Sequence, residues 1–259
     1  SNMTCTLARN GDLVQEIYLQ ATVAGTDDNV DVNNLIRTVE VEIGGQKIDK
    51  HYSQWLDIYN ELFENNIDYL KLMTNAEANG RTVYIPLRFW FNRNAGLALP
   101  LIALQYHEVK ILVELNKDAD LGVKGTLTAK DMSLLVNYVY LDTDERRRFA
   151  QVSHEYLIEQ VQHTGTDSGT AITLTYNHPV KALFWSGANS TAAKLQLNGH
   201  DRFTEQTKKY FKLVQPHECG LGVHGKSMNI TNLPELRRYG KLSEGNTTIN
   251  EPTTSMYSF

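Results

Sequence analysis

The chain has 259 residues, of which 41% are hydrophobic and 21% are charged, the usual composition of a globular domain with a sizeable core. The formal net charge of −5 at pH 7 does not favour a nucleic-acid-binding protein. Only two cysteines, Cys5 and Cys219, are present, which favours a reducing compartment over a disulfide scaffold. No apolar run reaches the ~18 residues that a membrane-spanning helix needs.

Strand patterns dominate the first part of the chain. Residues 5–8 and 14–23 are strand-like and flank the turn signal Asn10-Gly11-Asp12. Residues 35–43 alternate between apolar and polar types, which is the period of a strand with one buried face. This segment ends at Gly44-Gly45, which predicts a tight turn.

Residues 81–113 form the densest apolar stretch of the chain. It contains three apolar runs, residues 83–91, 97–106 and 109–113. The Tyr, Ile, Phe, Trp and Val side chains of the first run suit a half-buried sheet. A proline early in each of the first two runs fits an edge strand or a bend better than a helix. We therefore predict a strand, a short loop, an extended corner and a strand, all devoted to packing.

The two halves of the chain share a pattern, which indicates a duplication. In the first half, apolar residues spaced three and four apart from Ile48 to Leu62 predict an amphipathic helix, and Asp49 could cap its start. In the second half, a strand pattern at residues 134–141 runs into a short helix capped by Asp142 or Thr143. The polar linker between the halves is predicted at residues 116–125.

The second half contains many short strand patterns and few helices, which is typical of a sandwich or a jelly roll. Asn198-Gly199 is a hairpin-type turn. Residues 215–255 are mostly polar and turn-forming, and we expect a long loop with one helical turn at residues 233–238. The predicted strands cover residues 156–162, 171–176, 181–185, 194–197 and 210–214.

One segment satisfies the P-loop pattern, with Gly220 followed by Gly225-Lys226-Ser227. A P-loop needs a buried strand before the first glycine and a helix from the lysine onward, and neither pattern is present here. His217, Cys219 and His224 have metal-ligating side chains but lack a fourth ligand at a usual spacing. We interpret this segment as a loop without nucleotide or metal.

No arrangement of catalytic residues is apparent in the sequence. His107-Glu108 and His154-Glu155 are adjacent pairs, and neighbours on a strand face opposite sides of a sheet. No serine lies in a G-x-S-x-G elbow. We therefore predict no enzyme, and no catalytic, cofactor-binding or metal-binding residues. Trp55, Trp90 and Trp185 are interpreted as core or interface anchors.

Two surface features remain to be assigned. The basic cluster from Arg146 to Arg148 either braces a helix against acidic neighbours or a subunit partner, or lies exposed to solvent. Asn-x-Ser/Thr motifs mark candidate glycosylation sites if the protein meets the modifying enzymes. Beside the motif at Asn2, these candidates are Asn189, Asn229 and Asn246.

The stretch IPLRFWFNRNAGLALPLIALQYHEVKI, residues 85–111, closely resembles a signature of the major capsid proteins of nucleo-cytoplasmic large DNA viruses, of the phycodnavirus, mimivirus and iridovirus type. The resemblance covers most of residues 9–216, in order. Its further segments are RNGDLV at 9–14, VEIGGQKID at 41–49, YLDTDERRRFAQ at 140–151, HEYLIEQ at 154–160, NHPVK at 177–181, LNGHDRF at 197–203 and YF at 210–211.

The resemblance implies an all-β double jelly roll, two tandem sandwiches with a few short helices, with outer strands missing at both ends of this sequence. The first jelly roll would span residues 1–115 and the second residues 116–259, including the long loop. Residues 219–255 match nothing in the family. This fold would make the chain a structural subunit of an icosahedral capsid that forms homotrimeric, pseudo-hexagonal capsomers.

The resemblance also implies the partners and location of the chain. It would contact neighbouring capsomers and minor capsid proteins, and it would not bind nucleic acid directly. An internal membrane would lie nearby in the virion. As a late protein it would assemble in the host cytoplasm into the virion shell, without a cofactor. The alternative functions are a jelly-roll carbohydrate-binding module, which would be a monomer or dimer with an aromatic sugar site, and a P-loop nucleotidase.

Overall fold

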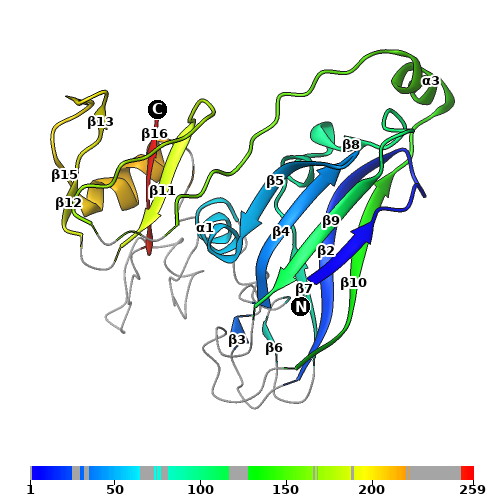
Figure 1. Cartoon of the computed structure of the whole chain (residues 1–259), viewed down its shortest axis with the longest axis horizontal. Helices are drawn as coiled ribbons and strands as arrows, with labels where there is room; N and C mark the ends of the chain where they lie inside the picture. The colour runs from blue at the N-terminus through cyan, green and yellow to red at the C-terminus, as the bar shows by residue number, and fades with distance from the viewer. Residues whose placement is uncertain are drawn as a thin grey trace, which may run out of the picture. The chain divides into compact units, whose positions relative to one another are not determined.

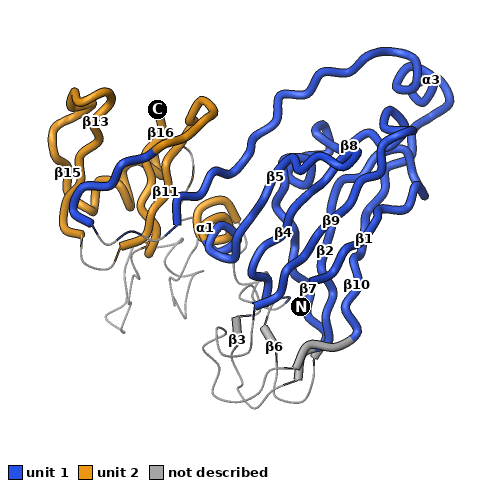
Figure 2. The backbone as a smooth tube through the Cα atoms, in the orientation of Figure 1, with its two compact units in different colours: residues 1–57, 70–174 blue, residues 58–69, 175–259 orange. Residues whose placement is uncertain are grey.

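The computed structural model divides into two compact units, one of residues 1–57 and 70–174 and the other of residues 58–69 and 175–259 (Figure 2). The residues that the structure describes are 2–24, 30–31, 35–64, 73, 75–76, 81–116, 128–165, 167, 169–187, 190–219, 221 and 252–259.

The first unit contains two antiparallel sheets that share one core (Figure 1). One sheet has the order β1-β9-β4-β5, formed by β1 (Asn2–Thr6), β9 (Val109–Leu115), β4 (Ile36–Ile43) and β5 (Gln46–Tyr52). The other has the order β10-β2-β7, formed by β10 (Thr128–Val139), β2 (Leu13–Ala24) and β7 (Arg81–Pro86), with β8 (Leu99–Pro100) also paired to β2. A small separate pair joins β3 (Val30–Asp31) to β6 (Asn75–Ala76).

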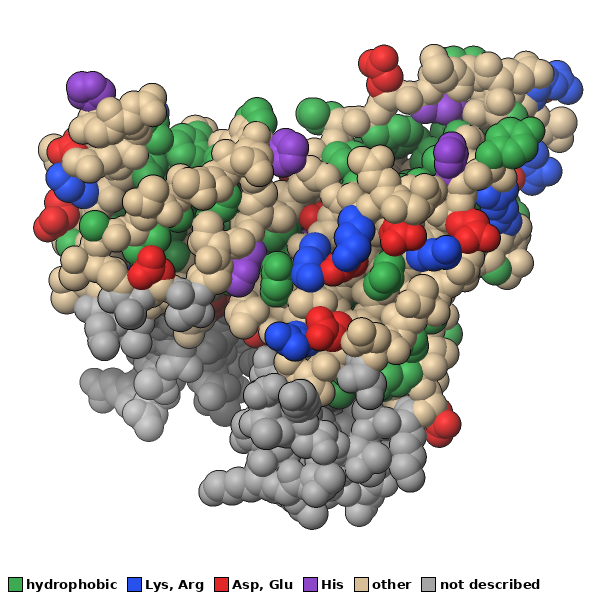
Figure 3. All heavy atoms as spheres, in the orientation of Figure 1, with side chains coloured by type: hydrophobic (Ala, Val, Ile, Leu, Met, Phe, Trp, Pro, Cys, Tyr) green, Lys and Arg blue, Asp and Glu red, His purple; other side chains and the backbone are tan. Residues whose placement is uncertain are grey.

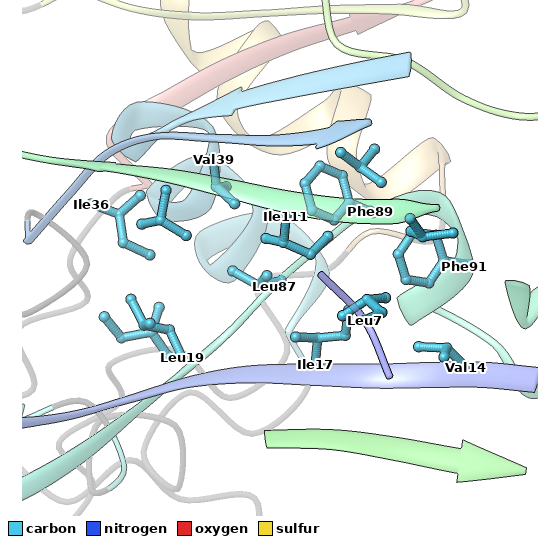
Figure 4. Close-up of a cluster of buried hydrophobic side chains, with 14 of the residues drawn as sticks. Leu7, Val14, Ile17, Leu19, Ile36, Val39, Leu87, Phe89, Phe91 and Ile111 are labelled. Carbon is cyan, nitrogen blue, oxygen red and sulfur yellow. The ribbon is translucent and has the colours of Figure 1, made fainter. Parts of the chain in front are cut away.

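The core lies between these sheets, where alternate residues of each strand point inward (Figure 4). On β2, Leu19 is fully buried and lies opposite Ile85 of β7. On the other sheet, Val39 of β4 is fully buried and lies opposite Val113 of β9. Burying a side chain of this size stabilises the fold by about 1.5–3 kcal/mol.

The stretch at residues 81–113 supplies much of this core, as predicted. Between β7 and β9 it forms two short 3-10 helices, η2 (Trp90–Asn92) and η3 (Ala95–Leu97). The rings of Phe89 and Phe91 stack 5.8 Å apart, centroid to centroid. Its buried apolar residues are Val83, Ile85, Leu87, Phe89, Trp90, Phe91, Ala98, Leu99, Leu101, Val109, Ile111 and Val113.

The two predicted turns differ in what they connect. Gly44 (φ +59°) and Gly45 (φ +83°) join β4 to β5 in a hairpin, which confirms the tight turn. The turn at residues 10–12 instead leads from one sheet to the other. β1 pairs with β9, whereas β2 pairs with β10, β7 and β8.

The first predicted helix begins later than expected, and Asp49 does not cap it. The helix is α1 (Ser53–Phe63), while Ile48 and Tyr52 lie in β5. Pairing with β4 fixes this part of the chain in an extended conformation, since Tyr52 lies opposite Thr38. The sequence period alone did not reveal that partner strand.

The second predicted helix is confirmed as α3 (Thr143–Gln151). Asp142 is its N-cap, and its Oδ1 accepts a bond of 2.8 Å from the amide of Glu145. The strand before it, β10, pairs with β2 in the first unit. Except for Asn116, the expected linker lies outside the described residues. The compact units are divided at other positions than the predicted jelly rolls, whose boundary at residue 116 stays a prediction.

Besides the end of α1, the described residues of the second unit form three short strand pairs and two helical turns. Asn198 (φ 51°) and Gly199 (φ 80°) form the predicted hairpin turn between β13 and β14. The strand pairs are β11 (Ala182–Ser186) with β16 (Thr254–Ser258), β12 (Ala192–Ala193) with β15 (Gln206–Thr207), and β13 (Gln196–Leu197) with β14 (His200–Asp201). The helical turns are η5 (Tyr210–Val214), a π-helix, and α4 (Gln215–Glu218).

Three strand predictions in the second half are wrong. Residues 156–162 and 171–176 belong to no strand, and residues 210–214 form the π-helix η5. In η5 the ring of Phe211 is buried and lies 5.1 Å from that of Trp185, a tertiary contact that outweighs the local strand preference. The helical turn expected at residues 233–238 lies outside the described residues.

Candidate functional site

The structure brings none of the candidate catalytic or metal-ligating residues into a cluster among the residues it describes. His217 and Cys219 are exposed in α4 and just after it, and His224 is outside the described residues. Across the described ranges, no group of three or more His, Cys, Asp or Glu side chains is placed to hold a metal ion. The P-loop-like segment is described only at Leu221, and Asn189, Asn229 and Asn246 are likewise outside the described residues.

The histidines and tryptophans singled out from sequence take part in packing. A Cβ added at Gly44 would lie 2.6 Å from the Nδ1 of His107, so that ring lies directly over the β4–β5 turn. The Nε2 of His154 lies 2.8 Å from the carbonyl oxygen of Phe149 at the end of α3. Trp90 is buried, and its ring lies edge-on to Phe91 at 5.1 Å. These positions fit anchors of the fold.

The basic cluster contains one clear brace. The guanidinium of Arg146 donates to Asp12 Oδ2 at 2.9 Å, and the amide of Leu141 donates to the same oxygen at 2.8 Å. These bonds, that of Arg146 first, lower the pKa of Asp12 although burial opposes them. Asp12 thereby ties the connection between β1 and β2 to the start of α3. The bracing role predicted for the cluster is confirmed at Arg146.

The outer face of the sheet β1-β9-β4-β5 carries paired charges (Figure 3). Burial raises the pKa of Glu40, but bonds from Lys47 and Lys50, each at 2.7 Å, outweigh it and lower that pKa. Arg37 and Glu114 form another pair across β4 and β9 at 3.2 Å. The exposed Arg37–Glu114 pair contributes little to stability, but it keeps the face hydrated.

The outer face of the sheet β10-β2-β7 is nearly uncharged. Tyr18 of β2 lies opposite Leu135 of β10, and Gln20 lies opposite both Ser133 of β10 and Tyr84 of β7. Leu135 is 42% exposed. The charged side chains described as exposed or half-buried on this face are Glu16, which accepts a bond of 2.9 Å from Asn137, and Asp131 near the N-terminal end of β10. We call this surface the uncharged face.

An exposed aromatic residue stands on a well-anchored loop of the same unit. Tyr106 is 94% exposed. The guanidinium of Arg9 donates to the carbonyl oxygens of Leu104 at 2.7 Å and His107 at 3.2 Å, and also to that of Gln105. An aromatic side chain on a loop held by three such bonds can bind a partner at little entropic cost. Sequence reasoning missed this use of Arg9, because its partners lie about a hundred residues along the chain.

In the second unit, Glu61 holds the last strand. Its carboxylate accepts bonds from the amides of Thr253 (2.7 Å) and Thr254 (3.0 Å) and from their hydroxyls (2.9 and 2.5 Å). Burial raises the pKa of Glu61, but these bonds outweigh it and lower that pKa.

No helix among the described residues is long and apolar enough to cross a membrane.

The first unit has two antiparallel sheets around one core, with short helices at their ends. This architecture places the chain in the class of jelly-roll proteins. The family model of the major capsid protein N-terminus matches residues 1–142, and that of the large eukaryotic DNA virus major capsid protein matches residues 145–193. The chain therefore belongs to the major capsid proteins of large eukaryotic DNA viruses.

Individual relatives agree with this assignment. The major capsid protein of Pyramimonas orientalis virus is 51% identical over 246 residues, which cover 83% of this chain and 62% of that protein. The major capsid protein of Paramecium bursaria Chlorella virus 1 is 37% identical over 288 residues, covering 84% of this chain and 66% of that protein. The chain thus spans less than two thirds of either relative.

A solved structure is similar over the whole chain. A chain in the quasi-atomic model of the PBCV-1 virus capsid matches with a TM-score of 0.75 and 31% identity, covering 100% of this chain and 73% of that chain. The mostly-β fold class and the family resemblance predicted from sequence are therefore confirmed.

Proposed function

We propose that this chain is a structural subunit of the icosahedral capsid of a large DNA virus and that it acts by assembly, without catalysing a reaction. The observation that carries the proposal is the match of both capsid family models, in order, along residues 1–193. The similarity to a chain of an assembled capsid supports it over the full length.

The mechanism that we propose is shape complementarity between rigid walls. The densely packed core makes the sandwich of the first unit stiff, because close-packed interiors deform little. The uncharged face and the Tyr106 loop would be buried against neighbouring copies, since interface cores are depleted of charge and enriched in aromatic residues. The charged face of β1-β9-β4-β5 would stay in contact with water.

We further propose that three copies form a pseudo-hexagonal capsomer, which contacts neighbouring capsomers and minor capsid proteins. Assembly would take place in the host cytoplasm and the product would reside in the virion shell, next to an internal membrane and without direct contact to nucleic acid. Closed symmetry of this kind uses the same surface patches on every copy. The division into jelly rolls at residues 1–115 and 116–259 belongs to this proposal.

Size-exclusion chromatography with light scattering tests the proposal. We expect a homotrimer from the unmodified chain and a monomer from Leu135→Glu, which places a charge on the uncharged face. Thr4→Glu is the matched control, because it adds the same charge at an exposed position of β1. A stable monomer that binds glycans would instead support the carbohydrate-binding alternative.

A further inference from the structure

The segment at residues 153–165, which we call the strap, leaves α3 in an extended conformation and forms no strand (Figure 1). Two of its side chains hold it on the first unit, since Ile158 packs against the core and Glu159 forms an ion pair with Arg93. The next residues of the strap bond to β5, the last strand in the order β1-β9-β4-β5. The strap therefore meets this sheet at an edge strand.

The contacts of the strap occupy backbone groups at the centre of β5. The amide of Val161 donates to Asp49 Oδ1 at 3.0 Å, and the side chain of Gln160 donates to the carbonyl oxygen of Ile48. The same Oδ1 also accepts the amide of Lys50 at 2.9 Å. Residues two apart on a strand direct their backbone groups to the same side. Side chains thus bind the Ile48 carbonyl and the Lys50 amide, the groups that an added strand would use.

The same part of β5 has two further features that discourage strand pairing. Asp49 is buried and lies opposite the buried Val41, so its charge points inward, where its Oδ2 lies 2.8 Å from Nε2 of His51. The register between β4 and β5 shifts after Val41, which leaves Ile48 as the extra residue of a β-bulge. Inward-pointing charges, bulges and covering segments are the means by which proteins keep edge strands from pairing with other chains.

We propose that the strap covers the β5 edge and thereby prevents β5 from pairing with β5 of a second copy. β5 has seven residues, which is long enough for a strand pair, and two identical edges can pair antiparallel about a twofold axis. The strap makes its bonds to β5 through side chains and forms no ladder, so it blocks the edge without extending the sheet. This role belongs to the single chain and does not depend on the proposed capsid function.

Removing the bonds of the strap tests this role in the full chain. Gln160→Ala removes one bond, and the double variant Gln160→Ala/Val161→Pro removes both. Each is made together with Leu135→Glu and compared with Leu135→Glu alone, so that association through the uncharged face is not counted. A comparison between otherwise identical chains remains valid even if the proposed homotrimer does not form.

Light scattering over a series of concentrations measures the association. The strap and a second copy compete for the same groups, and each hydrogen bond is worth a factor of about three to ten. The double variant should therefore dimerise at a concentration about 10- to 100-fold lower than its parent, and Gln160→Ala at one about three- to tenfold lower. Hydrogen exchange should show that the Lys50 amide gains protection as the dimer forms, while β4 and β9 stay protected throughout.

Thr164→Pro, in the same background, is the matched control. It places a proline at an exposed residue of the strap beyond the two bonds, and it should associate no more than its parent. The proposal is overturned if the double variant associates no more than Thr164→Pro, if Lys50 gains no protection in the dimer, or if association is accompanied by loss of protection in β4 and β9. Gln160 is exposed, so Gln160→Ala decides the question even if the double variant does not fold.

Discussion

Replacing Glu61 by alanine should detach the last strand, β16, from its unit. The side chain of Thr254 is 2% exposed, so its amide and hydroxyl cannot turn to water once Glu61 is removed. Each buried donor left without a partner costs about 1–3 kcal/mol, which gives a loss of about 2–6 kcal/mol in the local opening free energy. Thr253 is exposed, and its two donors can bond to solvent instead.

Hydrogen exchange of the amides in β16 and β11 measures this opening free energy directly. Glu61→Ala should reduce protection in both strands, and Glu61→Gln, which keeps an acceptor oxygen, should cost about 1 kcal/mol. Thr253→Ala is the control and should have a small effect. If Glu61→Ala leaves protection of β16 unchanged, or if Thr253→Ala is equally disruptive, the reasoning about buried donors is wrong.

The same contact predicts a pH dependence. The pKa of Glu61 in the folded chain is lowered from its ordinary value. The stabilisation is therefore fully present above the unfolded pKa of about 4.3 and is lost as the pH falls through the lower folded pKa. Protection of β16 should decrease only in this acid range. In Glu61→Gln the acid-dependent loss should disappear.

Three further predictions concern the first unit. Phe89→Ala should lower the free energy of unfolding by about 3–5 kcal/mol in urea titrations, because it empties a fully buried site; a loss below 1 kcal/mol would contradict the observed packing. Gly44→Ala should lower the midpoint of thermal unfolding, since the φ of Gly44 is +59° and the new Cβ would lie 2.6 Å from the ring of His107. A Cβ at Gly45 meets no such ring, so Gly45→Ala should lower the midpoint by less. Asp142→Ala should cost about 1 kcal/mol of α3 stability, seen as faster amide exchange in that helix, and Asp142→Ser should restore most of it.

The features that the sequence predicted well are those decided by neighbouring residues. The alternation at residues 35–43 became β4, and Gly44-Gly45 became the turn that follows it. Asp142 became the N-cap of α3 because the pattern of a capping residue before a short helix needs no distant partner. The dense apolar stretch at residues 81–113 supplies much of the core.

The features that the sequence did not predict depend on contacts far along the chain. Asp49 looked like a helix cap, yet its carboxylate binds Val161, 112 residues away. Residues 156–162 alternate like a strand, but they join no sheet. Residues 210–214 have strand-forming side chains, but burial of Phe211 selects a π-helix. In each case tertiary contacts outweighed the local preference.

Residues with recognisable chemistry were the least informative about function. The rings of His107 and His154 take part in local packing, whereas Glu108 and Glu155 are exposed. The useful functional indications were the distribution of charge over the two outer faces and the family match over most of the chain.

Electron microscopy of the purified chain tests the central claim most directly. If the chain is a capsid subunit, class averages should show particles with threefold symmetry and a pseudo-hexagonal outline, and Leu135→Glu should abolish them while Thr4→Glu preserves them. Uniform single-copy particles at the highest attainable concentration would contradict the account.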